Sequence, residues 1–195
     1  QFSHLWDMQH HTHNGHAPSH GFKVGIGTLA SVALYERLLA KPMDKLDVER
    51  CCAEWPDAES WVARGRELLG DKELAEGAAR ELRAKHSTPA QLGEQLKLLK
   101  SAWPDLRKQL RAQLLPLNTL RQMLRDVGAP TEPEQIGITR ARLRRSYWQA
   151  LCIRRRFTVL DLAVRTGLLD TCLDEIFGPT GLWPMDASAG AVARG

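Results

Sequence analysis

Apolar residues recur at helical spacing through most of the chain between residues 28 and 177. In the first such segment, Leu29, Val32 and Ala33 fall on one face of a helix, and Pro42 follows its end. No segment of useful length alternates between apolar and polar residues, as a half-buried strand would. The pattern therefore predicts an all-α domain. We expect helices over 28–39, 44–55, 58–69, 72–85 and 89–103, a sixth from 104, a seventh over 117–127, and two more between 134 and 177.

Capping residues and helix breakers mark several of these boundaries. Asp57 and Gly70 are typical of the start and the end of the helix that lies between them. Pro104 is typical of a first turn, so it predicts a new helix rather than the continuation of the fifth. The stretch 179–195 is rich in Gly and Ala without periodicity. We therefore expect a helical domain over residues 1–178 and a flexible tail over 179–195.

Composition indicates an ordinary globular protein. The 195 residues are 43% hydrophobic and 26% charged, with a formal net charge of +4. No apolar run approaches the roughly 20 residues of a membrane span, and the first twenty residues are too polar for a signal peptide. The four cysteines have neither the spacing of a disulfide framework nor that of a zinc site. These features predict a cytoplasmic protein with reduced thiols.

A basic segment covers residues 140–156 and contains seven arginines. It could be a helix that binds nucleic acid. However, Leu143, Tyr147 and Leu151 already give this segment a buried stripe, and the arginines fall mostly elsewhere. We favour an amphipathic helix with a solvated basic face, and we expect no nucleic-acid partner.

Histidine is concentrated at the start of the chain. Neutral imidazole is the commonest metal ligand in proteins and transfers protons near neutral pH, so this clustering indicates a metal or acid–base site. Within the cluster, His4 and Asp7 share a face if residues 4–7 are helical. Alternatives are a solvated histidine-rich loop and a metal-storing protein without enzymatic activity. Six of the seven histidines belong to the cluster: His4, His10, His11, His13, His16 and His20.

Two segments resemble a known enzyme family. Gln1-Phe-Ser-His4-Leu-Trp-Asp7, followed by Ser19-His20-Gly21-Phe-Lys-Val-Gly-Ile-Gly-Thr28, resembles the glycerol-1-phosphate dehydrogenase branch of the iron-alcohol-dehydrogenase and dehydroquinate-synthase superfamily. The segment Ile153-Arg-Arg-Arg-Phe-Thr-Val-Leu-Asp-Leu-Ala163 resembles a late helix of that branch. The resemblance implies the helical C-terminal domain of a two-domain enzyme, without its N-terminal dinucleotide-binding domain.

The family pattern also implies roles for individual histidines. His4 matches a substrate-contacting catalytic His, and His20 matches a metal ligand. Another metal-binding His would stand immediately before Gln1, and a metal-binding Asp would lie further upstream. His10 is a rival ligand, because the segment His10–Gly15 resembles the metal-binding segment of glycerol dehydrogenases. The remaining three histidines of the cluster are expected on the rim of the site, near the substrate phosphate.

The implied reaction is hydride transfer between NAD(P)H and dihydroxyacetone phosphate, which gives glycerol 1-phosphate. A divalent cation (zinc, nickel or iron) would hold and polarise the substrate. The expected partner is thus a small phosphorylated triose or glycerol. The resemblance leaves a homo-oligomer open, and this chain alone should be inactive. Glycerol dehydrogenase and 3-dehydroquinate synthase are the alternatives within the superfamily.

Overall fold

The computed structural model describes residues 1–185, and within this range the protein is built of helices without a β-strand. This confirms the all-α prediction. No helix of the described residues is long and apolar enough to cross a membrane. The helices are α1 (Phe2–Met8), α2 (His20–Leu39), α3 (Val48–Ala53), α4 (Ala58–Leu69), α5 (Lys72–Lys85), α6 (Pro89–Gln113), α7 (Leu117–Asp126), α8 (Arg140–Cys152), α9 (Val159–Arg165) and α10 (Leu169–Phe177), with 3-10 turns at Met43–Lys45 and Pro133–Ile136.

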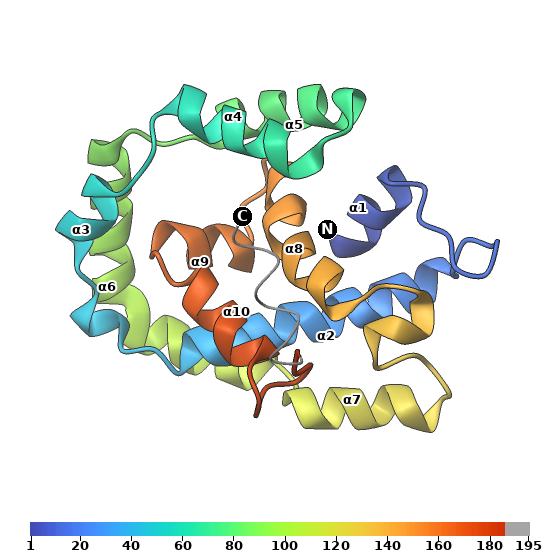
Figure 1. Cartoon of the computed structure of the whole chain (residues 1–195). Coiled ribbons are helices and arrows are strands. Elements are labelled where there is room, and N and C mark those ends of the chain that lie inside the picture. Colours follow the sequence, from blue (N-terminus) through green and yellow to red (C-terminus); the bar gives the residue numbers. More distant parts are fainter. Residues whose placement is uncertain (186–195) are drawn as a thin grey trace.

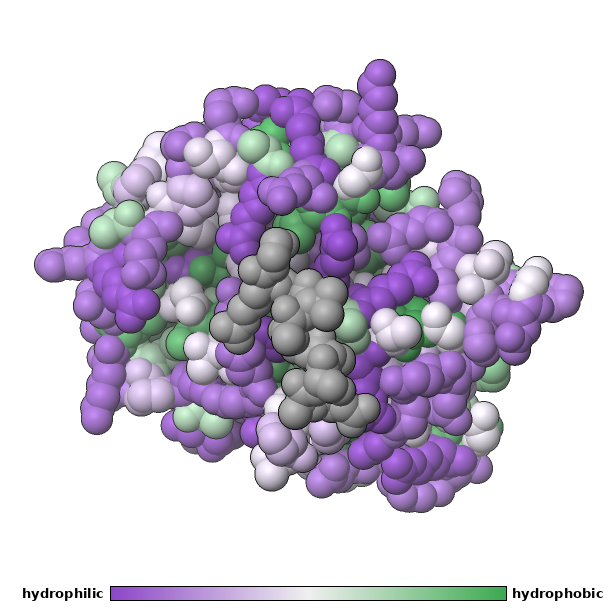
Figure 2. Space-filling model, in the orientation of Figure 1, coloured by the Kyte–Doolittle hydropathy of each residue, from purple (hydrophilic) through white to green (hydrophobic). Residues whose placement is uncertain are grey.

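Helices α2 and α8 form the centre of the fold (Figure 1). Helix α2 packs against α1, α7, α9 and α10, and α8 packs against α1, α4 and α5. Leu29, Leu34 and Leu38 of α2 are completely buried. Tyr147 of α8 is buried too, and its hydroxyl donates a 2.9 Å hydrogen bond to the carbonyl oxygen of Ala30. The surface in Figure 2 is mostly hydrophilic, as expected when these central helices take up the apolar side chains.

Helix α2 begins at His20, eight residues before the predicted start. Its cap is Ser19, whose side-chain oxygen accepts a hydrogen bond from the Phe22 amide at 3.1 Å. Three glycines follow within the first turns. Because glycine has a low helix propensity, the sequence pattern did not predict a helix in this part of the chain. One of them is needed for packing: a Cβ added at Gly27 would lie 3.0 Å from Cβ of Phe2 on α1.

Pro104 does not start a new helix, because α6 runs without interruption through it. Proline inside a helix costs about 3 kcal/mol relative to alanine. Leu92, Leu96 and Trp103 are buried on the inner side of α6, and their burial offsets this cost. The prediction of two helices here was wrong because it weighed a local signal without the packing.

The region 134–177 holds three helices where two were predicted. Helix α9 ends just before Gly167, whose φ of +67° favours glycine and turns the chain sharply into α10. The capping box of Thr158 and Asp161 starts α9. Both signals are local, and they separate the basic helix α8 from the two short helices that follow it.

The expected boundary at residue 178 also needs correction. Residues 179–185, the described part of the expected tail, pack onto the helical body. Trp183 is fully buried, and its indole N–H donates to the carbonyl oxygen of Thr131 at 3.2 Å. The domain therefore continues at least to Met185. The rest of the expected tail, 186–195, lies outside the described residues.

Candidate functional site

Helix α1 and the first turn of α2 bring together four polar side chains. Nδ1 of His20 lies 3.3 Å from Oδ2 of Asp7. The buried ammonium group of Lys23 donates a hydrogen bond to the other oxygen of Asp7. His4 lies on the same helix as Asp7, nearly one turn earlier. The two helices meet here because Phe2, Leu5 and Trp6 on the inner face of α1 are buried in the common core.

Asp7 is held in its charged form. The hydrogen bond from Lys23 is the main cause that lowers the pKa of the Asp7 carboxyl, and the bond from His20 adds to it. A carboxylate can only accept hydrogen bonds, so Nδ1 of His20 carries a proton, and in the neutral tautomer of the ring the lone pair is on Nε2. A carboxylate that orients the second nitrogen of an imidazole is the usual support of a metal-binding His.

His4 is exposed, and its imidazole is neutral at pH 7. The pKa of His4 lies below its usual value, first because neighbouring protein atoms shield the ring from water and second because the positive charge of Arg154 is close. The charges of Asp7 and His20 also act on it, with opposite signs. The fold therefore brings His4 and His20 into one cluster, and a neutral imidazole in this place can accept a proton.

The described residues alone do not form a complete metal centre. They contain no group of three or more His, Cys, Asp or Glu side chains that could hold a metal ion. What they offer is one imidazole, His20, which is exposed and oriented by Asp7. A metal bound here would need further ligands from outside the described residues. These residues thus fit a metal ion as part of its ligand set.

His10, the rival ligand, lies just beyond the end of α1. It is exposed, and its φ of +49° is unusual for a residue with a side chain. This backbone conformation lies near the start of the loop of residues 9–19, which joins α1 to α2. Within residues 1–185, no carboxylate orients the His10 ring in the way that Asp7 orients His20.

His11 is buried in the interior rather than on the rim where it was expected. Its Nε2 lies 2.7 Å from the carbonyl oxygen of Ile136, and Nη1 of Arg142 lies 2.8 Å from its Nδ1. Because guanidinium can only donate, Nδ1 accepts and Nε2 carries the proton. Both ring nitrogens are therefore occupied, and His11 attaches the loop of residues 9–19 to α8. Desolvation is the main cause that lowers the pKa of His11.

His13 and His16 pair through their backbones in a narrow hairpin. The His13 amide donates to the carbonyl oxygen of His16 at 2.8 Å, and the reverse bond is 3.1 Å. The His13 ring lies against Gly137, where an added Cβ would be only 2.4 Å from Nδ1. His13 thus packs against the chain near α8, and of the three expected rim residues only His16 is exposed.

The arginines of the basic segment mostly have partners inside the protein. Because these guanidinium groups pack and pair across helices, they are not a uniformly solvated face. The pairs are Arg140 with Glu132 and Glu134, Arg142 with Gln9 and His11, Arg144 with Asp174, Arg145 with the Leu68 carbonyl, and Arg155 with Glu81.

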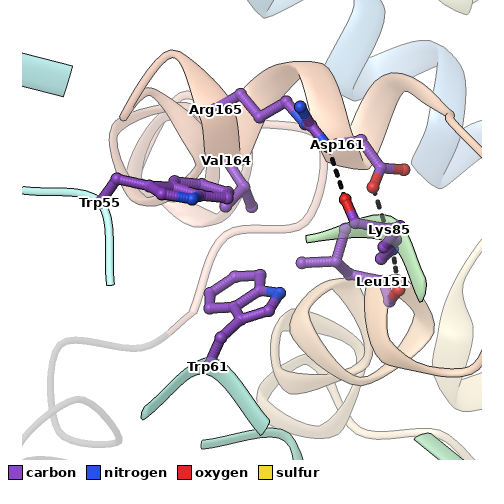
Figure 3. A pocket seen from close by; sticks show the side chains of 7 residues that line it. All are labelled: Trp55, Trp61, Lys85, Leu151, Asp161, Val164 and Arg165. Carbon is purple, nitrogen blue, oxygen red and sulfur yellow. Dashed lines mark hydrogen bonds and ion pairs between the residues drawn. The ribbon is translucent and has the colours of Figure 1, made fainter. Parts of the chain in front are cut away.

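A second polar cluster, which the sequence pattern did not indicate, lies where α5, α6 and α9 meet. Figure 3 shows Lys85 directed toward Asp161, with two tryptophan rings beside them. Nζ of Lys85 lies 2.9 Å from Oδ1 of Asp161 and donates to the carbonyl oxygen of Leu151 at 2.5 Å. Arg165 donates to the Lys85 carbonyl and to Ser87, both at 2.9 Å. Lys85 is thus paired with Asp161, and the Arg165 guanidinium is satisfied by neutral oxygens, so we assign the cluster a structural role.

Comparison with known proteins finds no match, either to a protein-family model, to a curated protein or to a solved structure.

Proposed function

We propose that this chain is the metal- and substrate-binding part of a metal-dependent, NAD(P)-linked glycerol-1-phosphate dehydrogenase, which interconverts dihydroxyacetone phosphate and glycerol 1-phosphate. The observation that carries the proposal is the pairing of His20 with Asp7, close to His4. These are three of the residues by which the chain resembles that family. The finer assignment of the fold, as the helical C-terminal domain of a dehydroquinate synthase-like enzyme, belongs to the same proposal.

In this proposal His20 is the metal ligand. Its Nε2 is free for the ion, while the Asp7 carboxylate fixes the tautomer and the ring orientation through Nδ1. Lys23 keeps Asp7 charged and in place, so that the imidazole has no need to reorganise on binding. A bound zinc, nickel or iron ion supplies a Lewis acid for the substrate's oxygens.

His4 is the proton-transferring residue of the proposal. In the direction of alcohol oxidation, the hydroxyl of glycerol 1-phosphate loses a proton while its carbon gives a hydride to NAD(P)⁺. A neutral imidazole is the correct acceptor, and the lowered pKa of His4 keeps it in that form at pH 7. In the reverse direction the protonated ring returns the proton to the new hydroxyl oxygen.

The experiment that tests the function uses the full-length protein containing this chain. We expect oxidation of NADH or NADPH with dihydroxyacetone phosphate, loss of activity after treatment with a chelator, and recovery with one of zinc, nickel or iron. Absence of turnover with all three metals would overturn the proposal. Turnover by the 195-residue chain alone, at ordinary enzymatic rates, would contradict its interpretation as part of a larger enzyme.

A further inference from the structure

The path of α1 along α8 places Arg154 at the edge of the histidine cluster. The two helices run antiparallel: the Trp6 indole N–H donates to Oγ of Ser146 at 3.0 Å, and further along α1 the Gln9 side chain contacts Arg142 at 3.1 Å. The beginning of α1 is therefore directed toward the end of α8. There the chain leaves the helix at Ile153 and continues into Arg154.

The loop that carries Arg154 is held on both sides. Before it, the Leu151 carbonyl accepts a hydrogen bond from the buried Lys85. Immediately after it, Glu81 accepts bonds from the Arg155 amide at 2.8 Å and from the Arg155 guanidinium at 2.8 and 3.1 Å. At the end of the loop, the Asp161 carboxylate accepts from the Thr158 amide at 2.9 Å. The backbone around Arg154 is thus fixed before any ligand arrives.

The guanidinium of Arg154 differs from that of the adjacent Arg155. Arg155 is committed to Glu81, whereas Arg154 makes no hydrogen bond or ion pair with the residues that the structure describes. Its positive charge nevertheless acts on His4. Asp7, the acid of the cluster, is already used by Lys23 and His20. An anion between Arg154 and His4 would therefore find a fork of N–H donors without displacing an existing partner.

We propose that Arg154 binds the phosphate group of the substrate, beside the reacting end that His4 contacts. The inference rests on the proposed function, and it names the group by which the site selects its substrate. A guanidinium fork matches two phosphate oxygens, and a fixed backbone reduces the entropy lost on binding. Arg154 is accordingly a specificity-determining residue that favours dihydroxyacetone phosphate over dihydroxyacetone, which has the same carbon skeleton.

The test compares two variants that remove the same charge from the same loop, Arg154→Ala and Arg156→Ala, in the full-length enzyme. We expect Arg154→Ala to lower kcat/KM for dihydroxyacetone phosphate roughly 10- to 100-fold, mainly through KM, because one charge-assisted contact is lost. Turnover of dihydroxyacetone should stay unchanged. Arg156 is exposed, and its variant should resemble the wild type with both substrates. An equal loss with both substrates, or the same loss in both variants, would overturn the proposal.

A binding measurement separates this inference from the proposed function. Inorganic phosphate is titrated into the 195-residue chain while the NMR signals of the His4 ring are followed. We expect shifts that saturate in the wild type and in Arg156→Ala but are lost in Arg154→Ala. If the enzyme shows no dehydrogenase activity and this pattern still appears, the anion site stands and the proposed reaction falls. If phosphate shifts the His4 signals equally in all three proteins, or in none, Arg154 is not an anion-binding residue.

Discussion

Lys85 and Asp161, which are 76 positions apart in the sequence, form an ion pair of 2.9 Å with side chains only 7% and 4% exposed. Each group has a further backbone partner, the Leu151 carbonyl for Lys85 and the Thr158 amide for Asp161. A buried pair is useful only when both ions are satisfied, since removal of one leaves the other charged and without compensation. Here the pair closes the loop that joins α8 to α9.

Replacement of one partner should therefore be strongly destabilising. We expect Asp161→Asn to lower the free energy of unfolding by about 3–5 kcal/mol, because it leaves the Lys85 ammonium buried without its counter-ion. Urea denaturation followed by circular dichroism measures the change. Glu54→Gln is the control, because it breaks the exposed pair of Glu54 with Arg50 and should have no measurable effect. Similar midpoints for the two variants would contradict the role of the buried pair.

Gly137 should not tolerate a side chain. Its φ of +74° already disfavours L-residues, by roughly 1–2 kcal/mol, and an added Cβ would overlap the His13 ring. We expect Gly137→Ala to lower the melting temperature more than Gly128→Ala does. Gly128 has a similar φ of +70° but open space around it, so its variant isolates the backbone cost. Equal shifts in the two variants would show that the His13 contact has no energetic weight.

Acid should weaken the attachment of the loop of residues 9–19 to the helical body. The pKa of His11 is lowered in the folded chain, so the unfolded chain takes up a proton first as the pH falls through its ordinary value of about 6.5. The contribution of His11 is thus complete above pH 6.5 and decreases below it. The free energy of unfolding at pH 7.5 and 5.5 should differ less in His11→Gln than in the wild type. His16→Gln, at an exposed position, should keep the wild-type difference.

The proposed division of roles among the histidines predicts three different phenotypes in the full-length enzyme. His20→Ala should reduce bound metal well below one ion per site, with activity following the metal. His4→Ala should retain metal but lose turnover, and His10→Ala should change neither. Elemental analysis and kinetics on the same samples measure both properties. Loss of metal from the His10 variant, with metal retained by the His20 variant, would favour the glycerol-dehydrogenase pattern instead.

Asp7 should influence the metal through His20. Asp7→Asn keeps the size of the side chain but removes the charge that orients the imidazole. Removal of such a support typically weakens metal binding about 10- to 100-fold. Titration with a competing chelator gives the affinity. If Asp7 served only the stability of the fold, the thermal stability of Asp7→Asn would fall while its metal affinity stayed at the wild-type value.

Much of the fold could be predicted because its boundaries are local. The bounds of α4 and α5 agree with the sequence prediction, since Asp57, Gly70 and Asp71 cap or end helices by contacts within a few residues. The start of α2 and the continuity of α6 could not be predicted in this way. In both, packing against distant residues outweighs an unfavourable local propensity, that of the early glycines and that of Pro104.

The same distinction applies to the candidate site. The motif around His4 and His20 indicated both residues, and the fold places them in one cluster with Asp7. His11 carried the same chemical signal but is taken up by Ile136 and Arg142, which are 125 and 131 positions away. Contacts over such separations leave no periodicity in the sequence, so residue type alone could not separate a buried histidine from an exposed one.

Helix α2 begins with the proposed metal ligand and continues without a break into the most deeply buried part of the protein. His20 and Leu34 therefore lie on one continuous helix without a hinge between them. A substitution that repacks the surroundings of Leu34 would tilt this helix and displace the His20 imidazole. Substitutions in the interior of this protein are therefore constrained during evolution, because the alignment of the His20 ring depends on how the apolar centre is filled.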